Sequence, residues 1–144
     1  MTKFFEMKLE DIQPSQLFIN VEKLNQVMKD FEPLSLETLP PIPVKELGKH
    51  VIFTDGHTRA LAAHLRGLEK VRVFWDEDEL DWEAYEMCVE WCQEARILTI
   101  ADLKDRVVAP EAYDVLWLER CEEMQHELHY PAQNLGEGKI TGQD

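Results

Sequence analysis

Residues 51–64 read VIFTDGHTRALAAH, and this stretch decides the fold. The apolar run 51–53 is typical of a buried strand, and residues 57–66 have the composition of a helix that ends at Gly67. Asp55-Gly56 between them is a turn signal. The sequence therefore predicts a strand that enters a helix through one tight turn.

The flanking sequence predicts further elements around this junction. Strands are expected over residues 3–12, 42–47 and 71–75, with 42–47 and 51–53 forming a hairpin. Further helices are expected over 20–31, 81–95, 99–106 and 110–129, with Asn20 and Thr99 as N-caps. This order predicts an α+β fold, in which a small mixed sheet with packed helices precedes a helical C-terminal cap. We expect a core over 1–78, a helical extension packed on it over 79–130 and a flexible tail over 131–144.

Composition and charge narrow the possible functions. The 144 residues are 44% hydrophobic and 31% charged, which is typical of one globular domain. The net charge is −14, so binding to DNA or to an anionic membrane is not expected. Residues 76–94 contain nine acidic and no basic residues, whereas 1–75 are neutral overall. The acidic run is interpreted as a solvated surface, with a metal site or a surface for a basic partner as the alternative.

Other features indicate a cytoplasmic protein. Three cysteines do not make a disulfide framework, residues 1–6 lack a signal-peptide pattern, and no apolar run is long enough to span a membrane. Cys88 and Cys92 lie one helical turn apart and are interpreted as core residues. The alternative is a zinc pair completed by His126 and His129. The four tryptophans are also assigned to packing.

The strand-to-helix turn carries the residues with useful chemistry. A helix N-terminus favours an anion, and a glycine lets a phosphate approach the backbone closely. The Arg59 guanidinium could pair with two phosphate oxygens, and Asp55 could orient Arg59, hold Mg²⁺ or accept a proton. The candidate phosphate- or nucleotide-binding residues are Thr54, Gly56, His57, Thr58 and Arg59. The simpler interpretation is structural: Thr54 or Asp55 caps the helix, and Arg59 pairs with a surface acid.

The order of short motifs over residues 5–76 resembles the ParB/sulfiredoxin superfamily. The matching segments are 9–16 (LEDIQPSQ), 39–44 (LPPIPV), the Gly56-His57-Thr58-Arg59 box and 67–73 (GLEKVRV). The resemblance implies that family's fold and a nucleotide or phosphate at the box. Sulfiredoxins have a reactive cysteine where His57 stands here, so sulfinic-acid reduction is not expected. The second box of ParB proteins is not found.

Within that superfamily, the box is most similar to the D-G-H-H-R of free-serine kinases. Asp55, Gly56, His57 and Arg59 match, and Thr58 departs. The resemblance implies ATP or ADP with Mg²⁺ as cofactors, and phosphate contacts from Gly56, His57 and Arg59. Those kinases also use a glutamate before the first helix; the aligned position here is Asn20, with Glu22 two residues further on.

Two functions follow as hypotheses. The first is nucleotide or phosphate binding at residues 54–59; an enzyme of this type would be a Mg²⁺-dependent small-molecule kinase with Asp55, His57 and Glu22 as catalytic candidates. The alternative is a non-catalytic module of the same fold that forms a homodimer or binds a protein partner. The sequence names neither the substrate nor the partner.

Overall fold

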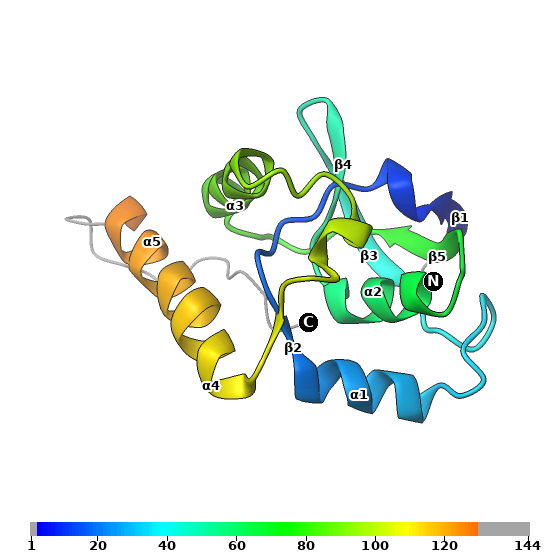
Figure 1. Ribbon diagram of the computed structural model, residues 1–144. Coiled ribbons are helices and arrows are strands. Elements are labelled where there is room, and N and C mark those ends of the chain that lie inside the picture. Colours follow the sequence, from blue (N-terminus) through cyan, green and yellow to red (C-terminus); the bar gives the residue numbers. More distant parts are fainter. Residues whose placement is uncertain (1–2, 130–144) are drawn as a thin grey trace.

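The protein has an α+β fold built on a four-stranded mixed sheet, as the sequence predicts (Figure 1). The computed structural model describes residues 3–129. The strands are β1 (Phe5–Lys8), β3 (Ile42–Leu47), β4 (His50–Phe53) and β5 (Lys70–Trp75), in the order β1-β5-β3-β4. The expected hairpin is β3–β4; β5 runs parallel to β3, and β1 runs antiparallel to β5.

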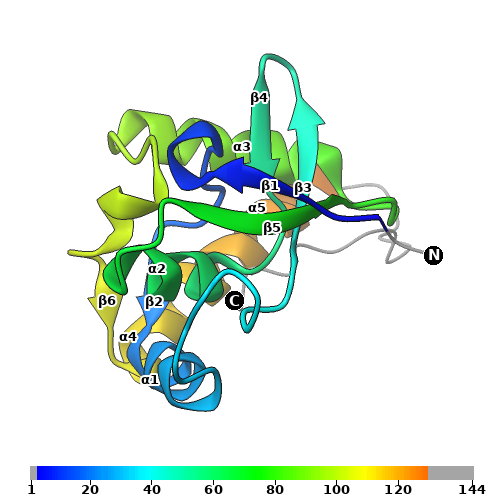
Figure 2. The same ribbon diagram turned by 90° about the vertical axis from the view of Figure 1, so that its right-hand side faces the viewer.

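Two helices lie on one side of this sheet, α1 (Val21–Asp30) and α2 (His57–Leu65) (Figure 2). Helix α2 buries Ala60, Leu61, Ala62 and Ala63 completely. The predicted cap of α1 is confirmed, because Asn20 Oδ1 accepts a hydrogen bond from the Glu22 N–H at 2.9 Å. A left-handed Gly67 (φ +85°) follows the end of α2, as expected for a helix C-terminus.

The helical C-terminal part follows β5. It contains α3 (Trp82–Glu94), the 3₁₀ turn η2 (Ile100–Leu103), α4 (Pro110–Tyr113) and α5 (Glu119–His129). A π-helical turn, η3 (Asp114–Leu118), joins α4 and α5, so residues 110–129 form the continuous helix that the sequence predicts. In Figure 1, α5 lies at the outer side of the molecule, next to α3. Trp117 is fully buried, whereas Leu116 beside it is 42% exposed.

The structure differs locally from the predictions, including at residues 99–106, where a 3₁₀ turn over Ile100–Leu103 replaces the expected helix. The chain leaves the sheet after Lys8 and enters the 3₁₀ turn η1 (Leu9–Asp11), so the strand expected over 3–12 is shorter. A second, parallel pair of strands, β2 (Ile19–Asn20) and β6 (Val107–Val108), was not predicted. Trp75, assigned to packing, is 43% exposed at the end of β5, where its ring contacts Phe5 with centroids 5.4 Å apart and planes tilted by 43°.

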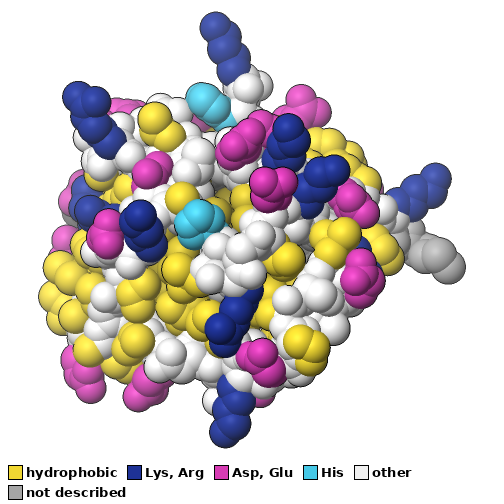
Figure 3. Space-filling view, turned by 45° about the vertical axis from the view of Figure 1, so that its right-hand side comes forward, with side chains coloured by type: hydrophobic (Ala, Val, Ile, Leu, Met, Phe, Trp, Pro, Cys, Tyr) yellow, Lys and Arg dark blue, Asp and Glu magenta, His cyan; other side chains and the backbone are white. Residues whose placement is uncertain are grey.

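Of the nine acidic residues in the run 76–94, seven are exposed and two are buried. Asp76 and Asp81 are each only 8% exposed; Asp76 accepts from the Thr54 hydroxyl, and Asp81 accepts from the Ala84 N–H of the helix that it caps. On the face drawn in Figure 3, acidic and basic side chains are intermixed. Within residues 3–129, no helix is both long and apolar enough to cross a membrane. The tail expected over 131–144 lies outside the described residues.

Asp81 connects the start of α3 to the end of α5. Its Oδ1 accepts from the Ala84 N–H (3.2 Å) and its Oδ2 lies 2.8 Å from His129 Nε2, with Gln125 Nε2 at 3.4 Å. Burial alone would raise the pKa of Asp81, but these hydrogen bonds outweigh it and lower the pKa below 3.8. The carboxylate therefore stabilises the fold above pH 3.8, and this contribution is lost as the pH falls through the lowered value.

We expect Asp81→Ala to lower the free energy of unfolding by about 1–3 kcal/mol, because it removes both the helix cap and the partner of His129. Asp81→Asn keeps a capping oxygen and loses only the charge, so its loss should be smaller. Urea denaturation at neutral pH measures both variants, with the exposed Glu83→Ala in the same helical turn as the control. Equal stability of Asp81→Ala and Glu83→Ala would contradict this role.

Candidate functional site

The turn between β4 and α2 requires glycine at position 56. Gly56 has φ +78° and ψ 18°, a left-handed conformation that residues with a Cβ adopt at a cost. A Cβ built on Gly56 would lie 2.7 Å from Ile42 Cγ2 and 2.9 Å from Arg59 Nη2. The backbone turn, the sheet and the arginine are therefore packed against one another at this single position.

The Arg59 guanidinium lies over this turn. The side chain projects back from the first turn of α2, and Nη1 donates to the backbone oxygen of Pro41 at 3.0 Å, with that of Pro40 at 3.5 Å. These contacts hold the guanidinium at the N-terminal end of the helix, beside Gly56. The sequence-based expectation that the turn and the guanidinium lie together is met by the geometry.

A hollow of about 300 Å³ opens beside Arg59. It is lined by Pro41, Pro43, Asp55, Arg59, Phe74, Asp76, Asp78 and Leu80. Two of the predicted site residues, Asp55 and Arg59, are among them. The hollow thus combines one guanidinium with three carboxylates and an apolar side formed by proline, phenylalanine and leucine.

Asp76 belongs to the framework of this hollow. Its Oδ2 accepts from the Thr54 hydroxyl at 2.6 Å, and its Oδ1 accepts from the Asp78 N–H at 2.9 Å. The Tyr85 hydroxyl donates to the Thr54 carbonyl oxygen at 2.8 Å, which connects α3 to the same point. Thr54, a predicted phosphate ligand, is buried and positions Asp76. Asp55 Oδ1 accepts from the Gly56 N–H at 2.8 Å.

The sequence reasoning missed Asp76 and Asp78 as site residues. They were assigned to the solvated acidic run, but β3 brings the chain after β5 next to the chain after β4. Thr54 N–H donates to the Pro43 oxygen and Asp76 N–H to the Val44 oxygen, at 3.2 and 2.8 Å. The available signal was that an aspartate follows the end of each strand, one at position 55 and one at 76.

His57, predicted as a phosphate ligand and catalytic residue, is buried and does not line the hollow. Its ring is 1% exposed and packs 5.3 Å from the Phe53 ring, and its Nε2 accepts from the Ser15 N–H at 2.9 Å. Burial lowers the pKa of His57 to about 3, so the imidazole is neutral at physiological pH. Since Nε2 is the acceptor, the proton is on Nδ1, for which residues 3–129 provide no hydrogen-bond partner. A role for His57 as a cation for phosphate does not fit this environment.

Two further predicted residues also lie outside the hollow. Thr58 is 1% exposed, and its Oγ1 has no hydrogen-bond partner within the described part of the chain. Glu22 is exposed in the first turn of α1 and does not line the hollow. The structure therefore brings together Asp55, Gly56 and Arg59, and it separates the hollow from the side chains of His57, Thr58 and Glu22.

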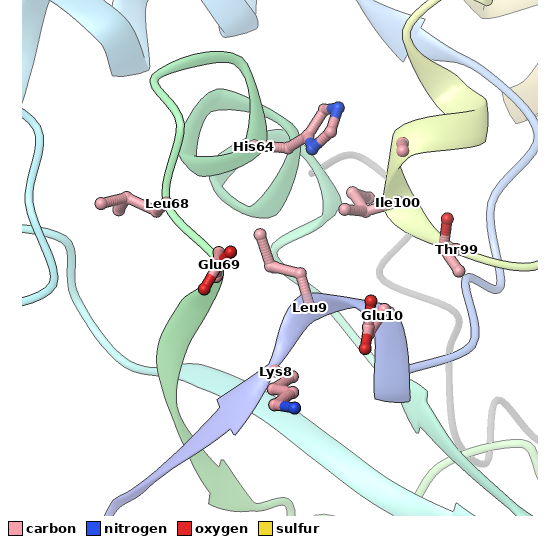
Figure 4. A pocket seen from close by; sticks show the side chains of 9 residues that line it. Lys8, Leu9, Glu10, His64, Leu68, Glu69, Thr99 and Ile100 are labelled. Atoms are coloured by element: carbon pink, nitrogen blue, oxygen red, sulfur yellow. The ribbon is translucent and has the colours of Figure 1, made fainter.

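A second hollow, of about 360 Å³, lies between η1, the end of α2 and η2 (Figure 4). Figure 4 shows the Leu9 side chain pointing toward α2, whereas Lys8 points away on the other side of the strand. His64 lines this hollow and not the one at Arg59. The lining of this second hollow includes both basic and acidic side chains, Lys8, Glu10 and Glu69, so its charge favours neither anions nor cations.

The alternative zinc site is not supported. Among residues 3–129, no three histidine, cysteine, aspartate or glutamate side chains are grouped so that they could hold a metal ion. Cys88 and Cys92 are fully buried, and His129 contacts Asp81. The cysteines are core residues, as the preferred interpretation predicts.

Comparison with known proteins adds little to this geometry. No family model and no curated protein matches the chain. Among solved structures, the protein Atu1540 from Agrobacterium tumefaciens is similar over 68% of this chain, with 13% identity and a TM-score of 0.45. The match covers 51% of that protein, so this chain spans about half of its length.

We expect Gly56→Ala to destabilise the fold by about 1–3 kcal/mol, because the Cβ adds backbone strain and displaces Ile42 or Arg59. Gly48→Ala is the matched control, since Gly48 has φ +62° with no atom within 4 Å of the added Cβ. The difference between the two variants in urea denaturation isolates the steric cost. Equal losses would contradict the close packing at Gly56.

We expect the buried neutral His57 to make the protein less stable as the pH falls. The folded-state pKa of about 3 lies below the ordinary 6.5, so the unfolded chain binds the extra proton first. Its contribution is complete above pH 6.5 and decreases toward pH 3, by at most about 1.4 kcal/mol per pH unit. Urea denaturation from neutral pH downward should show a shallower slope for His57→Gln. An unchanged slope would contradict this assignment.

Proposed function

We propose that the hollow at the β4–α2 turn binds a small phosphate-bearing molecule, such as ATP or ADP, together with Mg²⁺. The observation that carries the proposal is the Arg59 guanidinium, which is held over Gly56 at the start of a nine-residue helix. A guanidinium can pair with two phosphate oxygens, and the N-terminal end of a helix favours negative charge.

The three carboxylates determine which form of phosphate can enter. Asp55, Asp76 and Asp78 outnumber the single arginine in the lining, so a bare phosphate is repelled. Mg²⁺ changes this balance, because it is commonly bound by one or two carboxylates and by oxygens of the phosphate itself. Asp55 and Asp78 fit that use, since both line the hollow beside Arg59.

Among residues 3–129 no group of three side chains could hold a metal ion, so the proposal requires the phosphate oxygens as further Mg²⁺ ligands. Mg²⁺ would arrive with the phosphate, and the bound cation would neutralise charge on the phosphate oxygens. Arg59 would orient the phosphate, while Pro41, Pro43, Phe74 and Leu80 offer an apolar side to the rest of the ligand. Of the three predicted catalytic residues, Asp55 alone lines the hollow; if it accepts a proton from a hydroxyl substrate, Asp78 would be left to hold Mg²⁺.

The resemblance to the ParB/sulfiredoxin superfamily supports the same proposal on the sequence side, through Asp55, Gly56 and Arg59. Of the two possible functions, ligand binding and phosphoryl transfer, the geometry favours ligand binding. Phosphoryl transfer would need a hydroxyl substrate near Asp55, and the positions of His57 and Glu22 outside the hollow make binding without turnover the simpler function.

Titration calorimetry with ADP and with ATP, each with Mg²⁺ and with a chelator, tests the proposal. We expect binding that weakens about tenfold or more without Mg²⁺ and about tenfold or more in Arg59→Ala, with a smaller loss in Arg59→Lys. Asp78→Asn should reduce the gain that Mg²⁺ gives. Arg66→Ala is the control, because Arg66 lies at the other end of α2 and does not line the hollow. Its side chain is exposed and pairs with Glu32 at 3.2 Å.

Two results would overturn the proposal: no heat of binding for any of these ligands in the wild-type protein, or equal affinity in Arg59→Ala and Arg66→Ala. A turnover assay on a protein that binds then decides between a kinase and a binding module.

A further inference from the structure

Strand β1 is an edge strand whose outer side is unpaired in the described part of the chain. It lies at the end of the sheet order, beside β5 only. The Leu9 N–H donates to the Glu69 oxygen at 2.9 Å just beyond the β1–β5 ladder, at the position that continues its register as a hydrogen-bonded pair. Such pairs alternate along antiparallel strands. The backbone groups of Phe5 and Met7 therefore face β5, and those of Glu6 and Lys8 point outward.

The side chains of β1 divide between the two faces of the sheet. Phe5 is opposite Val73 and Met7 is opposite Val71, and both valines are buried. Glu6 and Lys8 lie on the other face, opposite Arg72 and Lys70. Lys8 and Lys70 thus place like charges directly across from each other, which is unfavourable.

We propose that β1 pairs with β1 of a second copy of this chain, antiparallel and around a two-fold axis at Met7. This register sets Glu6 opposite the partner's Lys8, and Lys8 opposite the partner's Glu6. Both members of each pair have outward backbone groups, so each pair can exchange two hydrogen bonds. The opposite charges share one face of the sheet, and each glutamate reduces the repulsion between Lys8 and Lys70.

Two neighbouring registers, with the two-fold axis at Glu6 or at Lys8, are less favourable than the register with the axis at Met7. An axis at Glu6 would bring two glutamates opposite each other, which is unfavourable. An axis at Lys8 would need residue 10 to pair with Glu6, but the chain has left the strand for η1 by then. On the other face, Met7 would meet the partner's Met7, and Phe5, which is 36% exposed, lies on that same face. Two copies of β1 are therefore complementary in charge when they pair in the register centred on Met7.

Light scattering after size exclusion, without added nucleotide, tests this dimer independently of the hollow at Arg59. We expect the wild-type protein at twice the 16.9 kDa chain mass. Lys8→Pro should be monomeric: Lys8 has φ −70° and ψ 137°, which proline adopts, and only the outward N–H is lost. Lys8→Ala, which keeps that N–H, is the control and should remain largely dimeric.

A charge exchange gives a second test that does not depend on proline. Glu6→Lys should weaken the dimer about tenfold, because it sets lysine against lysine in both pairs. Combining Glu6→Lys with Lys8→Glu exchanges the charges and should restore the dimer. A monomeric wild-type protein, a dimer that persists in Lys8→Pro, or a double variant no stronger than Glu6→Lys would each overturn the proposal.

Discussion

The close packing at Gly56 is the constraint on which this structure depends. Strand β4 ends beside β3, and the helix that packs on the sheet must begin within three residues. A left-handed glycine achieves this turn, and the lack of a Cβ leaves room for both Ile42 and the Arg59 guanidinium. The same contact therefore fixes the direction of α2 and places a positive charge at its start.

The hollow beside this turn is assembled around β3. The chain after β4 and the chain after β5 hydrogen-bond to neighbouring residues of β3, and the Thr54 hydroxyl joins the two through Asp76. Tyr85 extends the connection to α3. A buried hydrogen-bonded network of this kind rigidifies its surroundings, which suits a site that must hold an arginine and carboxylates at fixed positions. In the function proposed for this hollow, the acidic lining would make a divalent cation part of phosphate recognition.

Local signals allowed most of the elements and the turn itself to be predicted. Asn20, Gly56 and Gly67 each act through backbone conformation or capping within a few residues, so the sequence alone indicates their roles. Which residues line the hollow could not be predicted in the same way. The buried ring of His57 accepts from the N–H of Ser15, 42 residues away, and Asp76 reaches Thr54 because β3 pairs with both β4 and β5. Both depend on tertiary contacts that the pattern of residues does not contain.

The central claim is that Arg59, over Gly56, contacts a phosphate that Mg²⁺ accompanies. An NMR titration that follows the Arg59 side-chain Nε–H and the Gly56 backbone N–H tests it most directly. On addition of Mg²⁺-ADP, both signals should shift together and saturate, with the Arg66 side chain unchanged, and ADP with a chelator should have a much weaker effect. If the Arg59 and Gly56 signals stay in place while Mg²⁺-ADP is added, the account of this site is wrong.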